Sequence, residues 1–231
     1  MSSPWLAFWD SSHSIYVNAR HRDVHYRLIA QQIAALVPPP RARVLDYGCG
    51  EALHADLVAA AAGELLLAEG APRVRAGLAA RFAGNAKIRA VAPDEVERAA
   101  DRSLDLVVLH SVAQYLTPDE LAKLLALFRR LLHAGGVLVV SDIIPPDVAA
   151  STDALALLRF GAANGFFIAA IAGLVRTVLS DYWRLRTRYG LTRYGEAAMK
   201  EKLAAAGFAA QRAAHNIGHN QARMAFLARP R

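Results

Sequence analysis

The sequence predicts an α/β protein in which a mostly parallel sheet is covered by helices on both faces. Segments of helical periodicity alternate with five short apolar runs: RVLDY, ELLLAE, KIRAV, LDLVVLH and GVLVVSD. Such alternation is typical of parallel strands, because parallel neighbours need a crossover connection between them. The chain has 231 residues, 55% of them hydrophobic, which is enough for one domain with a substantial core.

Helix boundary signals divide the chain further. The crossover helices are expected over residues 51–61, 71–82, 94–99 and 118–132. The last is the clearest, because Thr117 can cap it, Pro118 suits its first position and HAGG should stop it. A further helix over about 23–36 should end at PPP. The runs GFAAQRAAH and ARMAFLA near the end of the chain could pair as a hairpin at the sheet's edge.

Composition limits the kind of protein. Cys49 is the only cysteine, so neither an intrachain disulfide nor a structural zinc site is expected. The first residues, MSSPWLAFWDSSH, do not resemble a secretory signal, and the longest uncharged stretch, 160–175, is shorter than the roughly 20 residues of a membrane span. A cytoplasmic protein is therefore expected. The net charge of +7 favours an anionic partner, which could be nucleic acid, a membrane face or an acidic substrate.

A glycine turn after the first strand indicates a ligand that approaches the backbone. Gly48 and Gly50 follow RVLDY directly. A dinucleotide fingerprint would need a third glycine where Leu53 stands, and a phosphate loop would need a lysine that the turn lacks. Glu69 ends the next strand, where an acid can accept hydrogen bonds from ribose hydroxyls. A nucleoside without a pyrophosphate is the ligand that this combination favours.

Four stretches in this order resemble the motifs of the class I S-adenosylmethionine-dependent methyltransferases: VLDYGCGEA, LLLAEG, SLDLVVLHSVAQYL and LLHAGGVLVVSD. The resemblance covers about 43–142 closely and the final hairpin loosely. It implies a Rossmann-like, doubly wound, seven-stranded sheet with an antiparallel last strand, an N-terminal helix and an inserted helical cap. It also implies S-adenosyl-L-methionine as cofactor and S-adenosyl-L-homocysteine as product.

Carried over position by position, the resemblance implies roles for several residues. Gly48 and Gly50 would let the methionine part of the cofactor lie against the backbone, with Asp46 organising the turn and Glu69 holding the ribose. The acidic residue that reaches the adenine aligns ambiguously with APDEV, and we assign it to Asp94, with Pro93 and Val96 as ring contacts. Ordinary solvation of strand ends is the alternative for the carboxylates.

Other polar residues are candidates for the reaction itself. His110 ends the fourth strand, where it could touch the cofactor, orient the acceptor or take a proton, and Tyr115 with Gln114 could line the site. Tyr16 and Arg20, with the neighbouring His21 and His25, fall in an N-terminal segment expected to cover the cofactor, although a solvated helix start would explain them equally well. His215 and His219 in HNIGHN are four residues apart, the spacing of two metal ligands on a helix. Their flanking residues indicate a strand and a turn instead, so we assign no metal site.

These predictions divide the single methyltransferase domain, 1–231, into three parts. Residues 1–40 form an N-terminal helical lid, 41–145 and 191–231 form the core, and 146–190 form a cap of two helices broken near Asn164 and Gly165. The second cap helix should carry an apolar face that includes Phe166, Phe167, Ala170, Ile171, Leu174, Val175, Val178, Leu179, Tyr182 and Trp183. Its opposite face should carry Gly173, Arg176, Thr177, Ser180 and Arg184.

The apolar face of the cap has several interpretations. It could pack on the core, form a homodimer, wall an apolar substrate site or contact a membrane peripherally. No appended RNA module and no [N/D]PP[Y/F] signature is present, so nucleic acid is not the favoured partner. We therefore expect methyl transfer to a small, apolar or lipid-like acceptor. The alternatives are an RNA or protein methyltransferase, and a non-catalytic cofactor-binding or membrane-surface protein.

Overall fold

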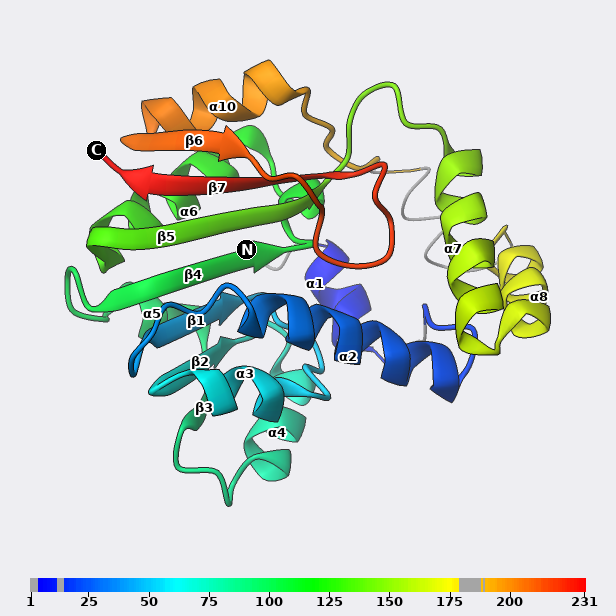
Figure 1. Cartoon of the computed structure of the whole chain (residues 1–231), viewed down its shortest axis with the longest axis horizontal. Coiled ribbons are helices and arrows are strands. Elements are labelled where there is room, and N and C mark those ends of the chain that lie inside the picture. The colour runs from blue at the N-terminus through cyan, green and yellow to red at the C-terminus, as the bar shows by residue number, and fades with distance from the viewer. Residues whose placement is uncertain (1–3, 12–14, 179–187, 189) are drawn as a thin grey trace.

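The fold is built around one seven-stranded sheet. A computed structural model describes residues 4–11, 15–178, 188 and 190–231 of the chain. The strand order is β3-β2-β1-β4-β5-β7-β6 (Figure 1). The strands are β1 (Arg43–Tyr47), β2 (Glu64–Ala68), β3 (Ile88–Val91), β4 (Leu104–His110), β5 (Leu132–Ile143), β6 (Phe208–Arg212) and β7 (Met224–Pro230). The first five pair in parallel and β7 is antiparallel to β5 and β6, which confirms the predicted sheet and its edge hairpin.

Helices cover both faces of the sheet, as the alternating pattern predicts. On one face lie α2 (Ala19–Ala34), α3 (Ala55–Ala61) and α4 (Pro72–Arg81), and on the other lie α5 (Pro93–Glu97), α6 (Pro118–Leu131) and α10 (Glu196–Ala205). Each face buries its own apolar cluster, because successive strand residues point to opposite sides. Ile33 and Val44 lie in one cluster, and Phe128 and Val107 in the other.

Local chemistry sets several element boundaries. The predicted cap of α6 is confirmed, since Thr117 Oγ1 accepts from the backbone of Glu120 at 3.2 Å. Helix α2 begins four residues before its predicted start, because Asn18 Oδ1 accepts from the backbone N–H of His21 at 2.8 Å. Helix α3 begins at Ala55, because the glycine turn continues through Ala52, whose φ is +38°.

One helix was not predicted. The segment α1 (Pro4–Trp9) has no periodic apolar pattern long enough to indicate a helix. Its Trp5 is nevertheless buried, with its ring 4.7 Å from that of Tyr115. Contacts with another part of the chain therefore stabilise this short helix.

The cap forms two helices beyond the carboxyl ends of the parallel strands (Figure 1). They are α7 (Ala150–Asn164) and α8 (Phe167–Val178), and the predicted break is confirmed by Gly165, which ends α7 with a φ of +75°. Phe166 and Ala170 are buried, whereas Phe167, Ile168, Ile171 and Val175 are exposed. Within the described residues, no helix is both long enough and apolar enough to span a membrane.

The predicted polar face of α8 needs one correction. Gly173 is buried, and a Cβ atom there would lie 2.1 Å from Val17 Cγ1, so this glycine packs against the N-terminal segment. Arg176 is exposed and donates from Nη2 to Val17 O at 3.1 Å. The parts of the predicted faces that involve Leu179, Ser180, Tyr182, Trp183 and Arg184 lie outside the described residues. The cap and the N-terminal segment thus contact one another.

Candidate active site

A cavity of about 700 Å³ lies at the carboxyl ends of four parallel strands. Its walls include the ends of β1 and β2, the ends of β4 and β5, helices α1 and α2, and the loop between β6 and β7. Ligands of open α/β sheets bind at this edge, because the strand order reverses there. The geometry therefore supports the predicted location of the site.

The glycine turn brings bare backbone to the cavity. Gly48 and Gly50 have φ angles of +74° and +58°, which glycine adopts without strain. A Cβ atom on Gly48 would lie 2.4 Å from Val112 Cγ2, and one on Gly50 would lie 2.9 Å from the hydroxyl of Tyr26. Neither position has room for a side chain, because Val112 and Tyr26 fill the space beside the two glycines, and both glycines line the cavity.

Glu69 is tied to this turn. Its carboxylate accepts from the backbone N–H of Gly50 at 2.9 Å and from that of Ala71 at 2.8 Å, and the residue is 8% exposed. Burial raises the pKa of Glu69, while the two backbone bonds act in the opposite direction. The carboxylate keeps lone pairs for two hydroxyl donors, which is what the diol of a ribose requires.

Asp46 lies close enough to Glu69 to feel its charge. Burial, with a smaller contribution from the negative charge of Glu69, raises the pKa of Asp46 to about 7. The carboxyl is therefore poised between its two protonation states near neutral pH. An arriving positive charge would favour the ionised form.

At the end of β4, both ring nitrogens of His110 have partners. Nδ1 lies 3.0 Å from Ser141 Oγ and Nε2 lies 3.4 Å from Ser111 Oγ. The Ser111 hydroxyl donates its proton to Asp142, so it can only accept from Nε2. Burial lowers the pKa of His110, which keeps the ring neutral with its proton on Nε2.

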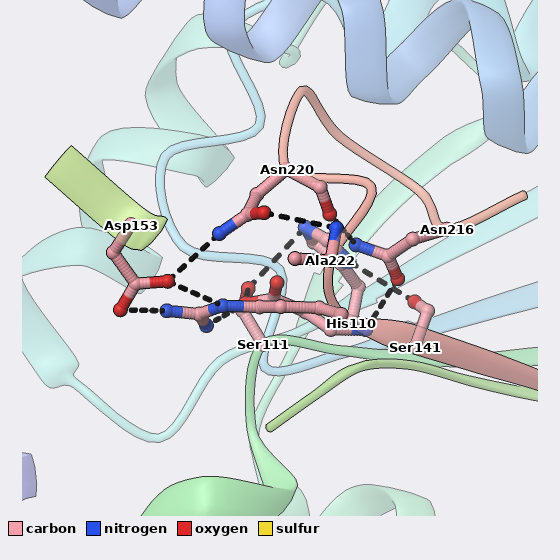
Figure 2. Close-up of polar contacts among 9 residues, drawn as sticks. His110, Ser111, Ser141, Asp153, Asn216, Asn220 and Ala222 are labelled. Atoms are coloured by element: carbon pink, nitrogen blue, oxygen red, sulfur yellow. Dashed lines mark hydrogen bonds and ion pairs between the residues drawn. The ribbon is translucent and has the colours of Figure 1, made fainter. Parts of the chain in front are cut away.

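A network of ion pairs joins the cap to the sheet beside His110. Arg223, from the loop between β6 and β7, donates to Asp142 Oδ2 at 2.9 Å and to Asp153 Oδ2 at 3.1 Å. Figure 2 shows that Asp153 also accepts a hydrogen bond from Asn220, with 2.8 Å between Asn220 Nδ2 and Asp153 Oδ1. Because Asp153 lies on α7, this network fixes the first cap helix against the end of the sheet.

Histidine and aromatic rings gather on the cap side of the cavity. His219 stacks on Phe160 with ring centroids 4.6 Å apart, and His25 lies 6.1 Å from His219 and 5.5 Å from Tyr16. Burial lowers the pKa of His25 and of His219, so both rings are neutral at pH 7. The surface is aromatic, uncharged and able to form hydrogen bonds.

The structure brings most of the predicted site residues together. The cavity is lined by Tyr16, Asp46, Gly48, Gly50, Glu69, His110 and Tyr115. Arg20 does not line it, because its side chain is directed to the carbonyl of Asn164 at 3.1 Å. Asp94 does not line it either, since its side chain is 63% exposed and pairs with Arg98. Pro93 does line the cavity, whereas Val96 is buried in the core.

Some cavity residues were missed or underrated. His25 and Tyr26 lie four positions before Ile29 and Ala30 on α2, and this helical spacing could have placed them on the inward face. Arg223 and His219 come from a loop without a periodic signal, so only the folded topology brings them here. Among the described residues, no group of three or more histidine, cysteine or acidic side chains is arranged to hold a metal.

Comparisons with known proteins agree with this geometry. A family model described as a methyltransferase domain matches residues 45–140. Magnesium protoporphyrin IX methyltransferase from Synechocystis PCC 6803, solved with bound S-adenosylhomocysteine, is 16% identical with a TM-score of 0.60, over 98% of this chain and 93% of that one. No curated protein matches the sequence significantly.

Two further solved structures share the fold. A Haloferax volcanii methyltransferase, solved with the Trm112 methyltransferase activator, is 13% identical with a TM-score of 0.60, over 91% of this chain and 92% of that one. The mitomycin 7-O-methyltransferase MmcR is 16% identical with a TM-score of 0.59, over 90% of this chain and 54% of that one. At these identities the likeness concerns the fold.

Proposed function

We propose that this chain is a class I S-adenosylmethionine-dependent methyltransferase and that it methylates a small, apolar or lipid-like acceptor. The cofactor supplies an electrophilic methyl group, and the protein has to place a nucleophile in line with it at about 3 Å in a dry site. The observation that carries the proposal is the cavity, whose lining combines the glycine turn and Glu69 with the rings of Trp5, Trp9, Tyr16 and Tyr115.

The chain's own residues fit the cofactor. Gly48 and Gly50 line the cavity, where the methionine part of the cofactor would lie along their turn, and Glu69 offers a buried carboxylate to its ribose. For the adenine, Pro93 supplies an apolar contact. Gln114, a buried polar residue that also lines the cavity, replaces the predicted Asp94 as our candidate for the adenine amino group.

The charge of the cavity favours a small neutral acceptor over nucleic acid. Within the described residues, the lining carries six acidic side chains and two arginines: Asp46, Glu51, Glu69, Glu120, Asp142 and Asp153 against Arg22 and Arg223. Both arginines are paired with carboxylates, Arg22 with Glu51 and Arg223 with two aspartates. Although the protein as a whole has a net charge of +7, the excess of carboxylates in the cavity would attract the cationic cofactor and repel phosphate groups.

The exposed side of α8 supports contact with a lipid surface. Phe167, Ile168, Ile171 and Val175 are between 42% and 76% exposed, and the exposed Arg176 follows them. Apolar side chains beside a basic one are typical of helices that lie at a membrane interface. A membrane contact of this kind would suit a lipid-like acceptor, although no described residue of α8 lines the cavity.

Transfer of a labelled methyl group tests the proposed function. Purified protein is incubated with tritiated-methyl cofactor and whole-cell extract, and the label is divided between an organic extract and macromolecules. We expect most of the label in the organic extract. Label that nuclease or protease releases from macromolecules would contradict the small acceptor, and cofactor binding without any transfer would favour the non-catalytic alternative.

Vesicle flotation tests the membrane contact. We expect the protein to float with vesicles containing phosphatidylglycerol, and Ile168→Asp to reduce the bound fraction at least about fivefold, because a charge cannot enter the apolar interface cheaply. Ala79→Asp, an exposed position on α4 with the same charge change, is the matched control. If both variants float equally well, α8 is not the contact. A wild-type dimer in light scattering that Ile168→Asp dissociates would assign the surface to a homodimer instead.

A further inference from the structure

Two stacked pairs of rings join the cap to the core beside the cavity. The ring of His219, in the loop between β6 and β7, lies 4.6 Å from that of Phe160 on α7, with 13° between their planes. The ring of His21 on α2 lies 4.9 Å from that of Phe166, directly before α8, with 20° between their planes. We call these four residues the ring latch. It connects the cap to two different elements of the core.

The ring latch is built for uncharged histidines. Nδ1 of His21 accepts a hydrogen bond from the backbone N–H of Val17 at 3.3 Å, so this nitrogen carries no proton. A second proton on the buried His21 ring would turn Nδ1 into a donor that opposes the N–H group. Phe160 and Phe166 offer an imidazolium only the weak attraction of a ring face, without a hydrogen-bond acceptor or a counter-charge.

A third histidine adds repulsion to any charge in the ring latch. The ring of His25 on α2 lies 6.0 Å from that of His21 and 6.1 Å from that of His219. The rings of His21 and His219 are 6.5 Å apart. At such distances in a site largely shielded from water, charges on any two of the three rings would repel one another. Each proton taken up therefore makes the closed contact less stable.

We propose that the ring latch is an acid-sensitive contact, in which protonation of His21 and His219 releases the second half of α7 together with α8. Asp153, in the first turn of α7, stays paired with Arg223 and can act as the fixed end of the cap. Release would uncover the cap side of His219, which lines the cavity. The inference rests on the proposed function for its consequence, which is acid-controlled access to the acceptor site.

The groups around His21 keep its ring neutral at pH 7. Burial lowers the pKa of His21 to about 4, with a smaller contribution from His219. Tyr16, whose ring is 5.5 Å away, is a neutral phenol because burial raises its pKa. The cations of the same contact, Arg20 and Arg176, are exposed and donate to backbone carbonyls.

The groups around His219 act in the same direction on balance. Burial lowers the pKa of His219 most, and the charges of Arg223 and His110 lower it further. The carboxylates of Asp142 and Asp153 oppose this effect, but both are paired with Arg223. The ring of His219 is therefore neutral at pH 7.

Proton linkage gives the size of the effect. In a released cap the His21 ring would be hydrated and would regain its ordinary pKa of 6.5. Between pH 7 and pH 5, His21 alone would then shift the balance between bound and released cap about 20-fold towards release. This contribution to cap binding is fully present above about pH 6.5 and is lost as the pH falls towards 4. His219 acts in the same direction, so its effect multiplies that of His21.

Hydrogen–deuterium exchange of the full chain without cofactor tests the ring latch. Exposure times are scaled to the intrinsic exchange rates at pH 7.0 and pH 5.0. The helices α7 and α8 have 15 and 12 residues, lengths at which an isolated helix is marginal in water, so a released cap should lose amide protection. We expect protection factors within 157–164 to fall at least about 20-fold at pH 5.0, while those of β4 stay within about twofold.

Phenylalanine variants keep the stacked rings but cannot take up a proton. In His21→Phe/His219→Phe, protection within 157–164 should differ less than about threefold between the two pH values. The lost bond to Val17 weakens the contact equally at both pH values, so it does not alter this comparison. His219→Phe alone should keep the fall of about 20-fold that His21 produces, which tests the latch without the double substitution. His215→Phe, at an exposed histidine of the same loop, is the matched control and should behave as wild type.

Three results would overturn the ring latch. The first is unchanged protection of α7 in wild type at pH 5.0. The second is an equal loss in α7 and β4, which would indicate unfolding of the whole chain by acid. The third is an undiminished loss in the double variant, shown by circular dichroism to be folded. In each case binding of S-adenosylhomocysteine by wild type would leave the proposed function intact. Acid release of α7 without any such binding would instead overturn the proposed function and leave the latch.

Discussion

The protonation of Asp46 should be coupled to cofactor binding. With a pKa of about 7, this carboxyl is about half protonated at pH 7 in the free protein. S-adenosylmethionine carries one more positive charge than S-adenosylhomocysteine, and that charge should favour the ionised carboxylate. Binding of S-adenosylmethionine at pH 7 should then release about 0.5 proton, and the release should fall towards zero near pH 9, where the free group is already ionised.

Calorimetry measures this release directly. Titrations at pH 7 in phosphate and in Tris, which differ in ionisation enthalpy, should give binding enthalpies that differ in proportion to the protons released. The affinity for S-adenosylmethionine should rise by up to about tenfold per pH unit below pH 7 and level off above about pH 8. The Asp46→Asn variant should show little of either effect. Equal enthalpies in the two buffers for wild type, or the same release from Asp46→Asn, would refute the reasoning.

The same pKa has an effect of opposite sign on folding. The folded protein binds this proton more tightly than the unfolded chain, whose aspartate has its ordinary pKa of 3.8. The contribution of Asp46 to stability is therefore fully present below about pH 4 and is lost as the pH rises through 7. Cofactor binding and stability should thus respond in opposite directions to pH at this residue.

Two further predictions concern the turn and the ion-pair network. Gly48→Ala should cost about 1–3 kcal/mol of stability in urea denaturation and abolish binding of S-adenosylhomocysteine, because the φ of Gly48 is +74° and a Cβ atom there would meet Val112. Gly77→Ala on α4, with open space around the glycine, should instead increase stability by up to about 1 kcal/mol. Equal effects of the two would contradict this explanation. Arg223→Ala should cost up to about 3–5 kcal/mol, because it removes the cation from two partly buried carboxylates that then keep only the hydrogen bonds of Ser111 and Asn220. Arg98→Ala, at an exposed pair, should cost less than about 1 kcal/mol in thermal melts. Similar melting temperatures for these two variants would show that the network does not stabilise the cap.

Much of the sheet could be predicted because its strands are buried on both faces and therefore read as continuous apolar runs. The run LDLVVLH coincides with β4 and RVLDY with β1. Glycine and proline signals likewise indicated the break at Gly165 and the start of α6 at Pro118. These features depend on local periodicity and local hydrogen bonds, which the sequence carries directly.

The start of β5 shows where local signals fail. HAGG was expected to stop a helix, and α6 does end before it at Leu131, but the strand begins at Leu132 instead of at the predicted run GVLVVSD and includes both glycines. Leu132 pairs with Leu104 across a register shift, so the neighbouring strand extends this one beyond its apolar run. Tertiary pairing overrides the weak strand propensity of glycine here.

The site was predictable only in part for a related reason. Gly48, Gly50 and Glu69 follow strands directly, so the topology of a parallel sheet places them at one edge. Asp94 was assigned from the chain order alone, but its side chain is directed outward to Arg98. Contacts between distant segments, such as the ion pair of Arg223 with Asp153 of the cap, cannot be predicted from any local sequence pattern.

Titration of S-adenosylhomocysteine into wild type and Glu69→Gln tests the assignment of the cofactor site most directly. The amide keeps the size of the side chain but replaces one acceptor oxygen with an NH₂ donor. This donor would face one of the two backbone N–H groups that Glu69 now accepts from, and the charge-assisted hydrogen bond to the ribose would be lost. We expect micromolar or tighter binding by wild type and a dissociation constant about 10–100-fold higher for Glu69→Gln, with Glu64→Gln at the opposite end of β2 unchanged. No binding by wild type, or equal binding by Glu69→Gln, would show that the cofactor does not occupy the edge formed by the glycine turn and Glu69.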